Sequence, residues 1–316
     1  MSLESAVTAE PAVRTPPDEI PPAAVTSLTG VSAQESQLRR NLKRFLIGNK
    51  LNLVGLIIVV LFLVLAVFGQ LFAPYNPYAQ DITGSKLLAP SLAHPMGTDE
   101  LGRDLLSRVM TGSRISLEVA VVVLSFAVVF GTLVGSIAGY FGGIVDELLM
   151  RFTDMFLAFP ALILAIAIAA SLGRELHWTM VALATVFWPW YARLVRGQIL
   201  SIRERDFVAA AESIGLSGPR LLARHILPNA VSVVIIQLTL DVGYAILATS
   251  SLSFIGLGAQ PPSPEWGTMM STARNYFREA WWYTTFPGLA LTLTVFAFNV
   301  LGDGLQDALD PRSGRR

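Results

Sequence analysis

The strongest constraint on this chain is a set of long apolar runs that contain no charged residue. Residues 53–69 are continuously apolar, and no charge lies within 119–145, 155–173 or 176–192. A helix needs about 20 mostly apolar residues to cross the roughly 30 Å hydrocarbon core of a membrane. We therefore predict an all-α integral membrane protein with six transmembrane helices, near residues 51–72, 117–139, 154–172, 178–197, 230–257 and 283–302.

Composition excludes several classes of function. The chain is 53% hydrophobic and only 15% charged, unlike soluble domains, and its net charge of zero gives no basic surface for a nucleic acid. It has no cysteine and no Gly-Lys dipeptide, which excludes disulfides, a thiol nucleophile and a phosphate-binding loop for ATP hydrolysis. His94, His177 and His225 are too far apart in sequence to predict a metal site. We therefore predict no catalytic, cofactor-binding or metal-binding residue.

The distribution of positive charge predicts the orientation. With the amino terminus inside, 16 of the 23 Lys and Arg residues fall on the cytoplasmic side, as the positive-inside rule requires. Both termini are therefore expected in the cytoplasm, with a disordered tail at 1–40 and a short tail at 305–316. A cleaved signal peptide fits poorly, because the first predicted helix begins only at residue 51. That helix and an external loop occupy 41–111, and the remaining transmembrane core occupies 112–304.

Between the fourth and fifth predicted helices, the polar segment 203–228 is too long for a simple turn. It predicts two short helices, the first ending at Gly215 as a left-handed cap would and the second starting near Pro219. One face of the first helix carries Phe207, Ala210, Ala211 and Ile214. On the residues alone, the pair either lies on the lipid headgroups or docks into another protein.

This segment resembles the coupling loop of the permeases of binding-protein-dependent ABC importers. The family pattern is matched at Ala210, Ala211, Gly215, Ile226, Leu227 and Pro228. The family's glutamate falls at Ala209, where this chain departs from the pattern, and Glu212 lies on a different face. The resemblance implies that an ATPase subunit contacts this loop. The residues it implies are Phe207, Ala209, Ala210, Ala211, Glu212, Gly215, Leu216, Ser217, Leu221 and His225.

Further stretches resemble the C-type permease subunit of dipeptide and oligopeptide importers, at 94–104, 139–143, 251–258 and 301–305. The resemblance implies the type I importer permease fold in the plasma (inner) membrane of a prokaryote. It implies as partners a second, similar permease subunit, two cytoplasmic ATPase subunits that hold ATP and Mg²⁺, an external substrate-binding protein and membrane lipid. The implied substrate is a dipeptide or oligopeptide, and nickel, glutathione and haem importers of the same permease type are alternatives.

Asp241 is the only charge between Arg224 and Glu265 and lies near the middle of the fifth predicted helix. An ionised carboxylate there costs about 3 kcal/mol or more unless it faces water or a partner. We hypothesise that it meets the ammonium group of a peptide in transit. The alternatives are a bond to a neighbouring helix or to an arginine of the partner subunit, and a proton-coupled carrier is the runner-up function. Thr249 and Ser250 are the other candidates for the translocation path, and Asp241 and Thr249 are expected to border one cavity.

Glycines predict two features of the second predicted helix. Gly131, Gly135 and Gly139 recur every four residues, which favours a close helix contact with another subunit. Gly142 and Gly143 follow directly and are expected to form a tight turn with positive φ angles.

Three further local features carry predictions. Thr98 or Asp99 is expected to cap the start of a helix. Pro189 is expected to kink the fourth predicted helix, where the aromatic residues of 187–191 stack on the kinked backbone, line the cavity or face lipid. The aromatic residues 281–283 are expected at the outer membrane interface.

Overall fold

The computed structural model describes residues 50–309. The predicted tail at 1–40 and most of the tail predicted at 305–316 lie outside this range, while residues up to Leu309 continue the last helix. Helices account for the secondary structure of the described residues, and one isolated bridge joins Thr98 to Asp104. The all-α prediction is confirmed for this part of the chain.

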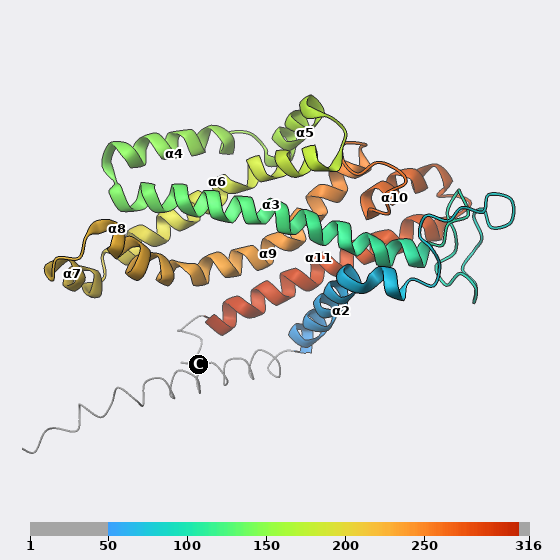
Figure 1. Ribbon diagram of the computed structural model, residues 1–316, viewed down its shortest axis with the longest axis horizontal. Coiled ribbons are helices and arrows are strands. Elements are labelled where there is room, and N and C mark those ends of the chain that lie inside the picture. Colours follow the sequence, from blue (N-terminus) through green and yellow to red (C-terminus); the bar gives the residue numbers. More distant parts are fainter. Residues whose placement is uncertain (1–49, 310–316) are drawn as a thin grey trace, which may run out of the picture.

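The helices form one elongated bundle (Figure 1). They are α2 (Lys50–Phe72), α3 (Leu105–Phe141), α4 (Gly143–Leu157), α5 (Ala161–Leu172), α6 (Leu176–Arg203), α7 (Asp206–Ser213), α8 (Gly218–Leu221), η2 (Leu222–Ile226), α9 (Leu227–Phe254), α10 (Trp266–Ala273), η3 (Arg274–Tyr276) and α11 (Trp281–Leu309). Figure 1 places α7 and α8 at one end of the molecule, and α10 with the loop 73–104 at the opposite end.

Helix length and hydropathy identify fewer membrane spans in the described residues than the six that the sequence predicts. Four helical stretches in the described residues are long and apolar enough to cross a membrane: α2, α3, the run Gly218–Phe254 and α11. The pair α4 and α5 makes a fifth if its two helices, bent by 82° at their junction, count as one span. The remaining predicted span corresponds to α6, which is long enough but less apolar, because its second half carries Arg193 and Arg196.

The third predicted helix, at 154–172, is instead divided between α4 and α5. Pro160 has φ −57° and ψ 124° and stands just before α5. Proline has no N–H for a helical bond and disfavours helical backbone at the residue before it, so the helix ends ahead of this position.

Helix α3 begins twelve residues earlier than predicted. Its N-cap is Asp104, whose carboxylate accepts the backbone N–H of Ser107 at 2.8 Å. Thr98 and Asp99 do not cap it. Both lie in the loop 73–104, where Thr98 Oγ1 accepts the N–H of Leu88 and Asp99 binds Arg103. With 37 residues at about 1.5 Å each, α3 is about 55 Å long and extends well beyond the hydrocarbon core.

The glycine pattern on α3 makes a contact within the chain, not with another subunit as predicted. Gly131 and Gly135 lie so close to α6 that a Cβ atom on either would collide with the backbone of that helix, at Trp188 and Ala192. The predicted tight turn is confirmed, since Gly142 and Gly143 have φ angles of 66° and 54°.

Candidate functional site

The predicted coupling segment folds as the short helices α7, α8 and η2. Apolar side chains on its inner side are almost completely buried in the same core cluster as residues of α3, α6 and α9: Val208, Leu221 and Ile226. Arg203 donates from Nη1 to the carbonyl of Tyr140 at 2.8 Å, and its guanidinium lies 5.6 Å from the centre of the Tyr140 ring. The segment is therefore seated on the bundle mainly by apolar packing.

The outer side of this segment presents apolar side chains to the surroundings. Phe207 is 40% exposed and Ile214 is 78% exposed. Gly215 has φ 82° and forms the turn after α7 that the sequence predicts. The other exposed residues of the predicted contact set are Ala209, Ala210, Glu212, Gly215 and Ser217.

Four residues of that set lie deeper. Ala211, Leu216 and His225 are half-buried. Leu221 is completely buried and cannot contact another protein, contrary to the sequence-based expectation. No motif indicated Val208, which is buried against the bundle, whereas Phe207 on the same helix and Ile214 at its end are exposed. The signal for Val208 was its place one residue after Phe207, about 100° further around a short helix.

Ion pairs fasten α4 to α6 near the same end of the bundle. Arg196 on α6 donates from Nη2 to Asp146 on α4 at 2.6 Å, and Arg193 donates to Asp154 at 2.6 Å. These contacts explain why α6 tolerates two arginines. Their charges are matched by acids on the neighbouring helix of the same chain.

The opposite end of the bundle is held by buried charges. The Asp99 carboxylate accepts from Arg103 Nε at 2.6 Å and lies 3.5 Å from Arg108 Nε, and all three residues are buried. Arg108 also donates to the carbonyl of Pro77 at 3.0 Å and reaches that of Pro262. In the surrounding loop, hydrogen bonds from Ser85, Gly84 and Thr83 hold the pKa of the exposed Asp81 below its ordinary value.

Asp241 lies at the midpoint of α9 and faces a cavity of about 250 Å³. Its Oδ1 accepts from Nε2 of Gln237 at 3.0 Å. The Tyr191 hydroxyl on α6 interacts electrostatically with the carboxylate, but it is buried without a hydrogen bond of normal geometry to any described residue. Among the described residues, no basic side chain forms an ion pair with Asp241.

Aromatic rings form much of the wall of this cavity. Phe187 and Tyr244 face each other with ring centres 5.4 Å apart, and Trp190 borders the same space. The lining residues are Ala161, Val186, Phe187, Trp190, Gln237, Asp241 and Tyr244. The aromatic run of 187–191 therefore divides: two of its members line a cavity, while Trp188 stacks on Phe152 and makes edge-on contacts with Phe130 and Phe156.

Thr249 and Ser250 do not border the Asp241 cavity. Thr249 is buried and donates to the carbonyl of Ala245 at 2.8 Å. Ser250 donates to Oε1 of Glu265 at 2.8 Å, a buried carboxylate that also caps α10 by accepting the N–H of Thr268. Sequence reasoning missed Glu265. Its position directly before a helix, with a threonine three residues later, was the available signal.

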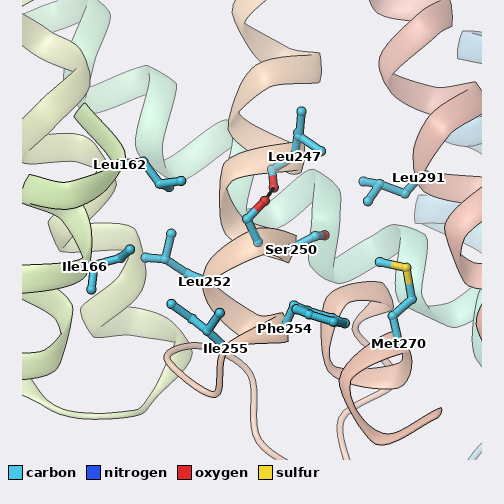
Figure 2. A pocket seen from close by; sticks show the side chains of 10 residues that line it. Leu162, Ile166, Leu247, Ser250, Leu252, Phe254, Ile255, Met270 and Leu291 are labelled. Carbon is cyan, nitrogen blue, oxygen red and sulfur yellow. Dashed lines mark hydrogen bonds between the residues drawn. The ribbon is translucent and has the colours of Figure 1, made fainter. Parts of the chain in front are cut away.

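Ser250 instead borders a larger apolar cavity of about 440 Å³ beside the C-terminal half of α9 (Figure 2). Side chains from α5, α9, α10 and α11 surround it, and they include Leu162, Ile166, Leu247, Phe254, Met270 and Leu291. The two cavities therefore differ in chemistry: one offers a carboxylate among aromatic rings, and the other is almost entirely aliphatic.

Comparison with known proteins identifies two matching families. Residues 131–315 match the family "Binding-protein-dependent transport system inner membrane component", and residues 36–90 match the "N-terminal TM domain of oligopeptide transport permease C".

Relatives cover most of the chain. A dipeptide transport system permease protein of Alkalihalophilus pseudofirmus is 45% identical over 264 residues, which make up 84% of this chain and 86% of that protein. A probable D,D-dipeptide transport system permease protein of Escherichia coli is 46% identical over 267 residues, or 84% and 89% of the two chains. A glutathione transport system permease protein of Escherichia coli is 44% identical over 254 residues, or 80% and 84%.

Proposed function

Because this chain belongs to the family of binding-protein-dependent transport system inner membrane components, we propose that it is the permease subunit of an ATP-driven importer of dipeptides. Relatives named for dipeptide transport at 45% and 46% identity support this substrate. The relative named for glutathione, itself a tripeptide, is 44% identical and makes glutathione the alternative substrate. In both cases the cargo is a small peptide.

The proposed membrane topology has six crossings and both termini in the cytoplasm. The crossings are α2, α3, the bent pair α4–α5, α6, α9 and α11. Helix α6 packs against α3, α4, α5 and α9, and its Arg193 and Arg196 pair with acids on α4. The membrane is proposed to be the plasma (inner) membrane of a prokaryote, and the division into 41–111 and 112–304 belongs to the same proposal.

The proposed role of α7 and α8 is to couple this chain to a cytoplasmic ATPase. ATP and Mg²⁺ would be held by the ATPase subunits, so this chain carries no catalytic residue. The exposed side chains of Phe207 and Ile214, on a segment seated by buried Val208 and Leu221, carry this proposal. The run Gly218–Phe254 leads directly from that segment to Asp241, so a displacement of α8 would be transmitted to the cavity.

The remaining proposed partners are a second, similar permease subunit, which completes the pore, and an external binding protein. The loop 73–104 with α10 forms the end of the molecule opposite the coupling segment (Figure 1) and is the proposed receiving surface for that binding protein.

Co-purification tests the proposal. The chain, expressed with its genomic neighbours and isolated in mild detergent, should bring down ATPase subunits and a second permease, and dipeptides with the binding protein should stimulate ATP hydrolysis. Ile214→Arg should remove the ATPase subunits while the second permease stays bound. Ser201→Arg, an exposed position on α6 outside the coupling segment, is the matched control. Isolation of a lone chain whose uptake stops when the proton gradient collapses would replace this proposal with the proton-coupled carrier.

A further inference from the structure

Within residues 50–309, no basic side chain forms an ion pair with the Asp241 carboxylate. Its one hydrogen bond of normal geometry comes from the neutral amide of Gln237 on the same helix, and the Tyr191 hydroxyl is the other polar group facing it. By contrast, Asp146 and Asp154 on α4 pair with two arginines of α6. A carboxylate at this depth is stabilised when a cation comes to it.

The walls of the cavity have the chemistry that binds an organic cation. Ring faces of tryptophan, tyrosine and phenylalanine attract ammonium groups through their quadrupoles, and groups of such rings recognise methylated ammonium ligands. Phe187, Trp190 and Tyr244 supply three rings from two helices around one carboxylate. An inorganic cation would instead call for several oxygen ligands, whereas this cavity offers those of Asp241 and the Gln237 amide.

Position and size restrict what this cavity accepts. Asp241 is about 21 Å along α9 from Leu227, at the middle of a 28-residue helix. The cavity volume of about 250 Å³ is below the roughly 300–1,000 Å³ of pockets that bury a whole drug-sized ligand. It therefore has room for one end of a peptide, with the remainder lying outside in the space between the two permease subunits.

We propose that Asp241, with the rings of Phe187, Trp190 and Tyr244, forms a site for the N-terminal ammonium group of the peptide as it crosses the membrane. This inference rests on the proposed function and adds to it a recognition step within the permease itself. The carboxylate pairs with the ammonium charge, and the rings contact the ammonium group and the carbon atoms beside it. Gln237 holds the carboxylate in position. A peptide without a free amino terminus lacks the group that this site binds.

The first experiment measures binding directly, in the purified complex without binding protein. Alanyl-alanine is titrated while tryptophan fluorescence is recorded, and Trp190→Phe identifies the contribution of that ring. We expect alanyl-alanine to change the Trp190 signal, and N-acetyl-alanyl-alanine, which has no ammonium group, to bind at least about ten-fold more weakly. Equal binding of the two peptides would overturn the proposal.

The second experiment uses Asp241→Asn, which keeps the shape of the side chain and removes its charge. Uptake of alanyl-alanine should fall about ten-fold or more while the subunits still co-purify, and Asp241→Glu should restore part of it. Thr239→Val changes a polar residue of the same helix outside the cavity lining and should leave uptake unchanged. Normal uptake by Asp241→Asn overturns the ammonium site alone. Absence of dipeptide uptake by the unmodified complex overturns the proposed function itself.

Discussion

The two ends of this bundle are held together by different kinds of interaction. The end formed by 73–104 and α10 contains buried ion pairs, centred on Asp99, that join the loop to α3 and to the carbonyl groups after α9. The end formed by α7, α8 and η2 is attached mainly by buried apolar side chains and by Arg203. Directional charge contacts fix one geometry, whereas apolar contacts allow small displacements at lower cost. The difference indicates a rigid end at 73–104 and α10, and an end at α7, α8 and η2 that can move.

The largest effect is expected from Asp99→Asn. This change leaves Arg103 and Arg108 buried with less negative charge beside them, and breaking such a pair costs about 3–5 kcal/mol. The melting temperature of the purified complex should fall sharply. Asp81→Asn, an exposed acid in the same loop, is the control and should change it little. Similar melting temperatures for both variants would remove the claim that buried charges fix this end.

Leu221→Ala should act locally at the other end. Truncating this completely buried leucine costs about 2–5 kcal/mol of packing. Hydrogen–deuterium exchange should rise across 206–226 while α3 stays protected, and peptide-stimulated ATP hydrolysis should fall. Leu216→Ala, at a half-buried position, should produce a smaller change. If exchange rises to the same extent in the loop 73–104, the two ends are not independent.

Gly215→Ala tests the turn after α7. The φ angle of 82° is unfavourable for any residue with a Cβ atom, and the expected cost is about 1 kcal/mol. No heavy atom lies within 4 Å of the added methyl group, so the effect reports backbone conformation alone. ATPase binding should weaken by up to about ten-fold, measured by titration of the ATPase subunits. Gly197→Ala, on α6 with equally open space, should leave binding unchanged.

The smallest effect is expected from Arg151→Ala. Arg151 and Glu147 are both well exposed, with a contact of 2.7 Å, and exposed pairs one turn apart contribute about 0.5 kcal/mol or less. A double-mutant cycle with Glu147→Ala, followed by melting temperature, should give a coupling energy near zero. A coupling energy of several kcal/mol would show that charge pairs stabilise the half of the bundle near α7 and α8 as strongly as the end at 73–104 and α10.

Apolar patterning predicted the helices well, but it did not predict which helices pack against each other. Long apolar runs in this chain became α2, α3, α9 and α11, because only helices satisfy backbone hydrogen bonds without water. The stripe at Gly131 and Gly135 correctly indicated a close contact, yet a stripe of small residues does not say whether the neighbouring helix belongs to the same chain. Here it is α6.

Other features depended on distances between residues far apart in sequence. Asp241 was identifiable because a charge within an apolar run is conspicuous. Its aromatic neighbours, however, come from both α6 and α9, and its separation from Ser250 follows from how α9 packs. The break between α4 and α5 could have been predicted from Pro160 in the sequence. It was missed because the flanking residues on both sides are apolar, so the run as a whole suggested one straight helix.

The length of α3 has a consequence for the lipid around this protein. A helix of about 55 Å that is anchored at one end by Asp104 and packed along α6 cannot shorten to suit a thinner bilayer. It can only tilt, or the bilayer must thicken around it, and either adjustment costs free energy for each ångström of mismatch. Acyl-chain length therefore acts on the angle at which the bundle stands, and through that angle on the separation along the membrane normal between the loop 73–104 and the helices α7 and α8.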